Sequence, residues 1–146
     1  MIVVTGGAGM IGSRVIAALN RQGISDILVV DNLVNGKKMK NLAGLNVVDY
    51  VDRDDFLSGI DNPNLFGEVT AVFHKGACSA TTEWDGRFLI KNNFEYSKRL
   101  LWWCDNRKIP FIYASSASVY GNAIDNFNED FAHECPINMY AYSKWQ

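Results

Sequence analysis

A glycine-rich segment lies near the N-terminus of the chain, directly after a run of apolar residues. It reads Thr5-Gly6-Gly7-Ala8-Gly9-Met10-Ile11-Gly12 and follows Met1–Val4, so we expect a strand, a turn and a helix. Glycine permits a tight turn at Gly6, a close approach of the backbone to a pyrophosphate at Gly9, and close packing of helix and strand at Gly12. The N-terminus of the helix then presents free N–H groups and partial positive charge. This pattern predicts a dinucleotide site.

Two segments further along the chain carry side chains suited to proton transfer. Tyr140 and Lys144 are four residues apart, which places both on one face of a helix. A tyrosine exchanges protons near neutral pH only where a cation stabilises its phenolate, and a lysine ammonium does so. Alone, this spacing is typical of a surface pair, but the segment Tyr113–Gly121 adds serines, of which Ser116 can hold a substrate oxygen. The three side chains behind a dinucleotide turn together indicate proton transfer to or from a substrate oxygen.

Short apolar runs alternate with longer amphipathic stretches, which is typical of an α/β fold with a parallel sheet. We expect five strands, at Ile2–Thr5, Ile27–Val30, Val47–Tyr50, Ala71–His74 and Phe111–Ala114. We expect helices at Ile11–Gln22, Lys38–Leu42, Asp54–Ile60 and Arg87–Asn106, and one that begins near Tyr140. Right-handed crossovers give a Rossmann-like, doubly wound sheet in the order 3-2-1-4-5, with ligands at the carboxyl ends of the strands.

The composition limits the classes of partner. The 146 residues are 48% hydrophobic, which is enough for one sizeable core and too little for two domains. A net charge of −2 gives no basic field, so we expect neither nucleic acid nor an anionic membrane as a partner. The three cysteines, Cys78, Cys104 and Cys135, include no Cys-x-x-Cys pair, so we expect no metal site and no disulfide framework. Because neither a signal segment nor a long apolar run is visible, we expect a cytoplasmic protein.

The motifs resemble those of the extended short-chain dehydrogenase/reductase family. This family carries Ser-Ser-Ala-x-x-Tyr-Gly at a strand end, and residues 115–121 match it, with Ser116 in the place of the catalytic serine. Tyr140 and Lys144 match the family's catalytic tyrosine and lysine. The resemblance implies that Tyr140 takes or returns the alcohol proton and that Ser116 hydrogen-bonds the same oxygen. It also implies that Lys144 binds the nicotinamide ribose and favours the phenolate.

Further segments are similar to one branch of this family, the ADP-glyceromanno-heptose 6-epimerases. They are Gly76–Gly86, Asn92-Asn93, Val29–Leu33 and Pro136–Tyr140. The resemblance implies an isomerase that interconverts ADP-D-glycero- and ADP-L-glycero-D-manno-heptose, an ADP-sugar of lipopolysaccharide core synthesis. Hydride would leave C6 of the heptose for NADP+, giving a transient ketone, and return to the opposite face. The family also implies a homopentamer.

The same resemblance implies a set of cofactor contacts. Besides Gly6, Gly9 and Gly12 of the turn, they are Met10, Ile11, Asp31, Asn32, Lys38, Arg53, Lys75, Gly76, Ala77, Cys78, Ser79, Asn92 and Lys144. Two of these positions depart from the family pattern, because Lys75 stands where the family usually has glutamate and Arg53 where it usually has lysine. Arg53 keeps the positive charge and can serve a phosphate through its fork geometry. Lys75 reverses a charge beside the end of the fourth expected strand.

The residues leave the choice between NAD and NADP balanced. Asp31 ends the second expected strand, a position that favours the 2′-hydroxyl of NAD. Asn32, Lys38 and Arg53 would instead suit the 2′-phosphate of NADP. The family leans to NADP, so the resemblance implies NADP, with NAD possible.

Three conspicuous side chains receive a structural interpretation. His74 ends an apolar run without a cluster of polar partners, so we expect it to be packed or hydrogen-bonded rather than catalytic. Trp102 and Trp103 are neighbours in the long helix, and we expect at least one of them in the core.

The chain ends fewer than two helical turns after Tyr140. We therefore expect residues 1–146 to be the incomplete NAD(P)-binding domain of a longer enzyme, whose C-terminal substrate domain and second catalytic base are absent. Two alternatives stay open: a nucleotide-binding module without turnover, or an enzyme for another nucleotide sugar, such as a UDP-galactose 4-epimerase or a 4,6-dehydratase. Ser116-Ala117-Ser118 lacks the acid pair typical of dehydratases, and Cys78–Gly86 disfavours a C4 epimerase.

Overall fold

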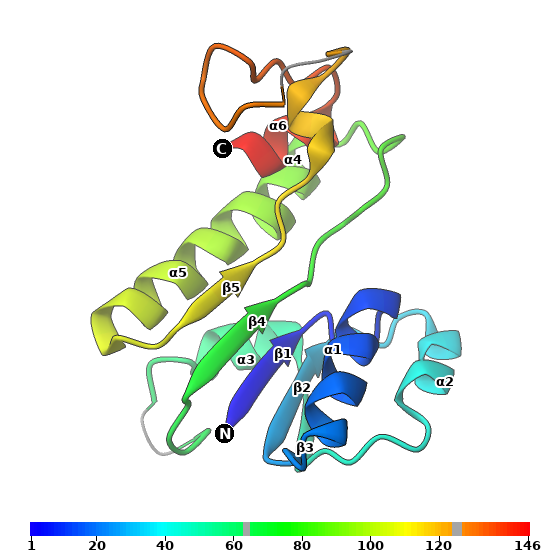
Figure 1. Ribbon diagram of the computed structural model, residues 1–146, viewed down its shortest axis with the longest axis vertical. Coiled ribbons are helices and arrows are strands. Elements are labelled where there is room, and N and C mark those ends of the chain that lie inside the picture. The colour runs from blue at the N-terminus through cyan, green and yellow to red at the C-terminus, as the bar shows by residue number, and fades with distance from the viewer. Residues whose placement is uncertain (63–64, 124–126) are drawn as a thin grey trace. The chain divides into compact units, whose positions relative to one another are not determined.

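The computed structural model describes residues 1–62, 65–123 and 127–146, and its helices and strands are shown in Figure 1. The chain divides into two compact units. The first comprises Met1–Gly76 and Arg99–Tyr113, and the second comprises Ala77–Lys98 and Ala114–Gln146.

The first unit contains a five-stranded sheet in the order β3-β2-β1-β4-β5, with every neighbouring pair parallel. Its strands are β1 (Ile2–Thr5), β2 (Ile27–Asp31), β3 (Asp49–Asp52), β4 (Ala71–His74) and β5 (Phe111–Tyr113). The predicted fold class and strand order are confirmed. Thr5 is in register with Val30 of β2 and with His74 of β4, so the segments that follow these three strands begin at the same edge of the sheet.

Helices of the first unit cover both faces of the sheet. They are α1 (Met10–Arg21), the 3-10 turn η1 (Gly36–Lys38), α2 (Met39–Leu42), α3 (Arg53–Gly59) and the part of α5 (Tyr96–Arg107) from Arg99 onward. α1 and α3 lie on opposite sides of the sheet (Figure 1). This alternation of faces is what a doubly wound fold requires.

The core of the first unit lies between α1 and the sheet. Ile16 of α1 packs against Val4, Ile27 and Val29, and all four have no exposed surface. Because side chains alternate along a strand, the buried neighbours of these residues in β1 and β2 point to the other face. Strands buried on both faces read as continuous apolar runs, which explains why β1 and β2 could be predicted closely.

The prediction for the third strand was wrong by two residues. We expected Val47–Tyr50, but β3 is Asp49–Asp52, and Val48 is 64% exposed. β3 pairs only with β2, with Leu28 opposite Asp49 and Asp31 opposite Asp52. An edge strand does not need two apolar faces, so its register follows the pairing with β2 and not the run of apolar residues.

The second unit is built from short helices. They are α4 (Gly86–Leu89), the π-helix η2 (Ile90–Glu95), the start of α5, the 3-10 turn η3 (Ala117–Tyr120) and α6 (Met139–Trp145). We predicted one continuous helix from Arg87 to Asn106, and the π-helix interrupts it. The Asp85 carboxylate accepts the Phe88 N–H and caps α4. The Asn138 side chain accepts the Ala141 N–H at 2.7 Å and caps α6.

The tryptophan prediction is confirmed, since Trp103 is 7% exposed and Trp102 is 61% exposed. Cys104, next to Trp103, is fully buried. Burial raises the pKa of the Cys104 thiol to about 11, against a smaller opposing effect of the Arg107 charge.

The raised pKa of Cys104 predicts a loss of stability in alkali. Because the folded chain holds this proton more tightly than the unfolded chain does, the contribution to stability is complete below 9.0, the ordinary pKa of the thiol, and is lost as the pH rises toward about 11. Urea titrations between these pH values should show the free energy of unfolding falling less steeply for Cys104→Ala than for the parent chain. If the free energy of unfolding fell equally steeply with pH for both proteins, the raised pKa would not belong to Cys104.

Candidate functional site

The glycine-rich turn after β1 forms a close-packed backbone cradle. Gly6 has φ +65°, and a Cβ there would lie 2.6 Å from the backbone nitrogen of Gly76. A Cβ at Gly12 would lie 2.2 Å from the Gly6 carbonyl oxygen. The predicted tight turn at Gly6 is confirmed. We predicted that Gly12 allows helix and strand to pack closely, but the backbone atoms nearest to Gly12 belong to Gly6 and Gly7 of the turn and not to β1. A cradle that any side chain would fill fits the pyrophosphate of a dinucleotide.

The cradle leads into the N-terminus of α1. Gly9 is the N-cap residue, forms no side-chain cap and has no acidic residue in the following turn. The first-turn N–H groups and the positive end of the helix dipole therefore remain available to an anion. Met10 and Ile11 are 74% and 58% exposed, so two apolar side chains stand in solvent beside this helix end.

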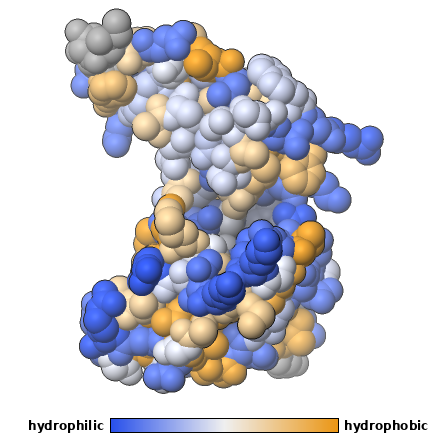
Figure 2. Space-filling model, turned by 90° about the vertical axis from the view of Figure 1, so that its right-hand side faces the viewer, coloured by the Kyte–Doolittle hydropathy of each residue, from blue (hydrophilic) through white to orange (hydrophobic). Residues whose placement is uncertain are grey.

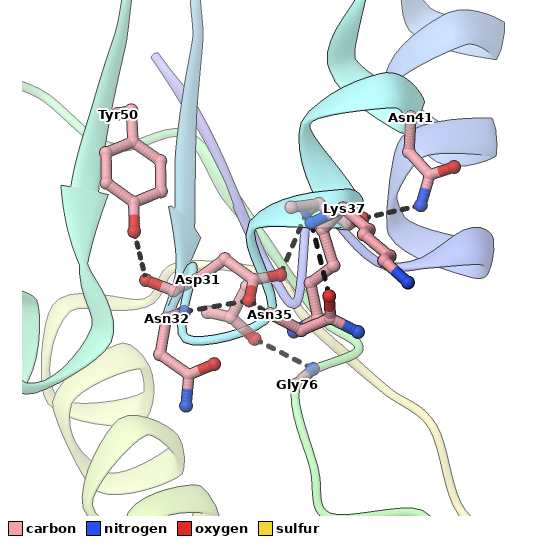
Figure 3. A network of polar contacts seen from close by, with 10 residues as sticks. Asp31, Asn32, Asn35, Lys37, Asn41, Tyr50 and Gly76 are labelled. Carbon is pink, nitrogen blue, oxygen red and sulfur yellow. Dashed lines mark hydrogen bonds and ion pairs between the residues drawn. The ribbon is translucent and has the colours of Figure 1, made fainter.

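Asp31 at the end of β2 is the centre of a polar network (Figure 3). Its side chain is 4% exposed, and its Oδ1 lies 2.8 Å from Lys38 Nζ. The same Oδ1 accepts the Asn32 N–H, and Oδ2 accepts the Ala8 N–H of the turn at 3.0 Å. One carboxylate thus links the cradle, the β2 end and η1, and its negative charge is offset by Lys38.

The end of β3 borders this network. The Tyr50 hydroxyl donates to the Asp31 backbone carbonyl at 2.8 Å (Figure 3), and burial, with the charges of Asp52 and Asp31, raises the pKa of Tyr50. Arg53 follows Asp52 and begins α3, where its Nε lies 3.4 Å from the Asp54 carboxylate. Lys38 lies in η1, which follows β2, and Arg53 lies directly after β3. Both cations therefore come after the carboxyl ends of two adjacent strands.

The end of β4 is held to β1 by Thr5. The Lys75 N–H donates to the Thr5 carbonyl at 3.1 Å, and the Gly76 N–H donates to Thr5 Oγ1 at 3.2 Å. His74 is 1% exposed, and its Nδ1 lies 2.5 Å from the same Oγ1. The structural interpretation of His74 is confirmed, because it is both packed and hydrogen-bonded.

The surface of the first unit is mixed in character. From the side that carries α2, hydrophilic residues alternate with hydrophobic ones (Figure 2). A shallow pocket of about 200 Å³ lies here, with Arg14, Lys40 and Asn41 among its lining residues. The Asn41 side chain also donates to the Ala8 carbonyl of the turn at 2.8 Å, a contact that nothing in the sequence motif indicates.

The second unit contains the serine, tyrosine and lysine of the predicted catalytic set. Lys144 is 9% exposed, and its Nζ donates to the Ala114 carbonyl at 3.1 Å. Ser116 caps η3 and its Oγ lies 2.7 Å from Ser118 Oγ. Tyr140 lies one turn before Lys144 in α6, so both are on one helical face, as predicted. Within the described residues, the Tyr140 hydroxyl forms no hydrogen bond, which leaves it open to a ligand.

The loop after Gly76 and the π-helix also meet in the second unit. Cys78 is held by the side chain of Asn93, which accepts its N–H at 2.8 Å and donates to its carbonyl at 3.0 Å. Asn92 is 8% exposed and donates to the Phe88 carbonyl at 2.6 Å. Asn93 was not among the predicted contacts, although it stands beside one of them in the sequence.

The predicted site residues therefore fall into two sets, one in each unit. The first unit brings together the turn, Asp31, Asn32 and Lys38, with Arg53, Lys75 and Gly76 at the same sheet edge. The second unit contains the others, which are Ala77, Cys78, Ser79, Asn92, Ser116, Tyr140 and Lys144.

The described part of the chain offers no candidate metal site. Across residues 1–62, 65–123 and 127–146, no group of three or more His, Cys, Asp or Glu side chains is arranged to bind a metal ion. Among the helices that the structure describes, none has the length and apolar character needed to cross a membrane.

Solved structures resemble the chain over almost its whole length. UDP-glucuronic acid 4-epimerase from Bacillus cereus, in complex with UDP-glucuronic acid and NAD, is 27% identical with a TM-score of 0.83, over 99% of this chain and 48% of that one. ADP-L-glycero-D-manno-heptose-6-epimerase from Helicobacter pylori is 29% identical with a TM-score of 0.82, over 99% and 47%. UDP-glucose 4-epimerase from Thermotoga maritima, with UDP-glucose, is 29% identical with a TM-score of 0.81, over 99% and 47%. The chain thus spans slightly less than half the length of these structures.

The family model described as the NAD dependent epimerase/dehydratase family matches residues 2–146. This match includes the glycine cradle, the Asp31 network and the Ser116, Tyr140 and Lys144 set. The chain belongs to the NAD dependent epimerase/dehydratase family.

Proposed function

We propose that residues 1–146 are the NAD(P)-binding part of a nucleotide-sugar epimerase that interconverts ADP-D-glycero- and ADP-L-glycero-D-manno-heptose at C6. The observation that carries this proposal is the hydrogen bond from Lys144 Nζ to the Ala114 carbonyl. It fastens the helix with Tyr140 and Lys144 to the segment that leads into Ser116. The Helicobacter pylori heptose epimerase and the quoted segments Gly76–Gly86 and Pro136–Tyr140 support the choice of sugar.

The serine, the tyrosine and the lysine of the second unit each have a distinct task in this reaction. Tyr140 takes the proton from the sugar hydroxyl, or returns it when the carbon is reduced again, and a second base of the whole enzyme serves the opposite face. Ser116 donates a hydrogen bond to the same oxygen and so orients it. Lys144 stabilises the charge of the phenolate that forms and hydrogen-bonds the nicotinamide ribose. The nicotinamide ring, when bound, accepts two electrons and a proton from the sugar carbon and gives them back.

The proposed cofactor is NADP, and the first unit supplies the contacts to its pyrophosphate and its 2′-phosphate. The cradle and the N-terminus of α1 take the pyrophosphate, and Met10 and Ile11 offer apolar contact beside it. Asp31 alone would repel a 2′-phosphate, but Lys38 offsets its charge at 2.8 Å. Lys38 is about one-third exposed, so its ammonium can reach a phosphate as well as the carboxylate. Arg53 adds a second cation at the end of the next strand.

Removal of these two cations should change cofactor choice. For Lys38→Ala with Arg53→Ala, we expect NADP+ affinity to fall by about 100-fold and NAD+ affinity by less than about threefold, because only the 2′-phosphate needs both charges. Calorimetric titration of the chain with each nucleotide measures this. Lys40→Ala, an exposed lysine of α2, is the matched control. Equal losses for both nucleotides would remove the 2′-phosphate assignment.

The substrate is tested by following C6 of the sugar. In the whole enzyme, ADP-D-glycero-D-manno-heptose with NADP+ should reach an equilibrium of two epimers, which NMR of the H6 signal resolves. UDP-glucose and UDP-glucuronic acid, tested in parallel, should stay unchanged. Conversion of a UDP-sugar instead would keep the epimerase class and replace the substrate. The oligomeric state implied by the family, a homopentamer, is read from light scattering of the same sample.

A further inference from the structure

The reaction proposed above leaves one pocket of the first unit without a role. Its volume is about 200 Å³, and its first wall is formed by Met10, Ser13, Arg14 and Ala17 of α1. Residues at these spacings lie on one side of a helix. Lys40 and Asn41 of α2 line its second wall. Pockets that enclose drug-sized ligands measure about 300 to 1,000 Å³, so this one suits a small group rather than a whole nucleotide.

The two walls of the pocket are fastened to each other at two places. The Asn41 side chain donates to the Ala8 carbonyl at 2.8 Å, just before the N-terminus of α1 (Figure 3). Near the other end of α1, the Asn20 side chain donates to the Asn46 carbonyl at 2.9 Å and accepts the Asn46 N–H at 2.8 Å. Leu45, which also lines the pocket, packs against the core. Walls that are fixed before a ligand arrives need not be ordered when it binds.

The lining of the pocket is positively charged. It includes the exposed side chains of Arg14 and Lys40, and none of the described residues that line it is acidic. Within residues 1–62, 65–123 and 127–146, neither of these two side chains forms an ion pair or a hydrogen bond. The Ser13 hydroxyl proton is already used, because it is donated to the Met10 carbonyl at 3.1 Å. Two like charges at one pocket repel each other, and an anion between them removes this repulsion.

We propose that this pocket binds a phosphoryl dianion, either free phosphate or the phosphate group of a monoester, at a site separate from that of the cofactor. The Arg14 guanidinium holds two oxygens through its fork, and Lys40 adds a point charge. Asn41 adds a neutral donor, because its amide nitrogen has two protons and the Ala8 carbonyl takes one. Lys38 and Lys40 are two positions apart and so point to different sides: Lys38 pairs with Asp31, while Lys40 lines the pocket.

Titration of the isotope-labelled chain with inorganic phosphate, followed by NMR at constant pH and ionic strength, tests the proposal. We expect the Asn41 side-chain amide signal to shift with a dissociation constant of about 1 to 10 mM, and chloride to leave it unchanged. Arg14→Gln with Lys40→Gln should weaken phosphate binding at least about tenfold. Arg21→Gln, which removes a cation from the last turn of α1 outside the pocket, is the matched control and should bind as the parent chain does. An equal response to chloride, or unchanged phosphate affinity in the double variant, would overturn the proposal.

Two further titrations identify the source of the phosphoryl group and separate this pocket from the cofactor site. Glycerol 3-phosphate is the probe for a monoester: if it binds more tightly than inorganic phosphate, the ligand is a phosphorylated metabolite, and the reverse order supports the free ion. With NADP+ present in excess, the Asn41 signal should still respond to phosphate. Loss of that response would mean that the two ligands share one site and would overturn the proposal. A chain that does not bind NADP+ would remove the proposed function, and the phosphate titration would still decide whether the pocket binds an anion.

Discussion

In the whole enzyme proposed above, Tyr140→Phe is expected to reduce turnover by a factor of about 10² to 10⁴, the loss that accompanies removal of a general acid and base. The substitution deletes one hydroxyl and leaves the ring of a half-buried residue in place. It does not touch the bond from Lys144 Nζ to the Ala114 carbonyl or the Asn138 cap of α6. Cofactor affinity should therefore stay within about twofold of the parent value, since the loss arises in the transition state and not in binding.

Tyr142→Phe provides the matched control. Tyr142 lies in the same helix and is 40% exposed, and its ring is tilted by 38° against that of Trp145, with 5.9 Å between the ring centres. Because it is two residues from Tyr140, it points to a different side of α6. Turnover should persist in Tyr142→Phe and vanish in Tyr140→Phe, measured by the H6 signal of the heptose. Loss of cofactor binding in Tyr140→Phe would instead make Tyr140 a structural residue.

The parts of the fold that follow from local physics could be predicted from the sequence. β1 and β4 were predicted with their observed bounds, because both are central strands of the sheet and their sequences are largely apolar runs. Gly6 was predicted as a tight turn and has φ +65°. α6 begins one residue before Tyr140, directly after the Asn138 cap.

The parts that depend on partners distant in sequence could not be predicted. β3 took its register from β2 and not from its own apolar residues. Asn93 of the π-helix forms hydrogen bonds with Cys78 and Ser143, which are 15 and 50 residues away. The Lys38 and Asp31 ion pair joins residues only seven positions apart, yet it was not predicted either. The family resemblance implied that both residues contact the cofactor, but it could not reveal that each offsets the charge of the other.

Gly12→Ala is expected to abolish cofactor binding. The new Cβ would lie 2.2 Å from the Gly6 carbonyl oxygen and 2.8 Å from both Gly6 C and Gly7 Cα. All three are backbone atoms, so no side chain can rotate to relieve the contact. The backbone of Gly6 cannot shift away from the new Cβ without a further loss. Its N–H donates to the Val30 carbonyl of β2 at 2.7 Å, and a shift would break this hydrogen bond. Overpacking of this kind costs about 1 to 3 kcal/mol of stability.

The expected result is an affinity for NADP+ at least about 100-fold weaker, since the N–H groups of the cradle no longer converge on the pyrophosphate. Gly36→Ala is the control, because a Cβ at Gly36 meets no atom within 4 Å, and its melting temperature should match that of the parent chain. Calorimetry with NADP+ and thermal unfolding of the same samples separate lost binding from lost stability. A Gly12→Ala variant that is folded but does not bind NADP+ would support the proposal that the cradle holds the pyrophosphate. A variant that binds NADP+ normally would mean that the turn holds no phosphate, and the cofactor site would have to lie elsewhere in the chain.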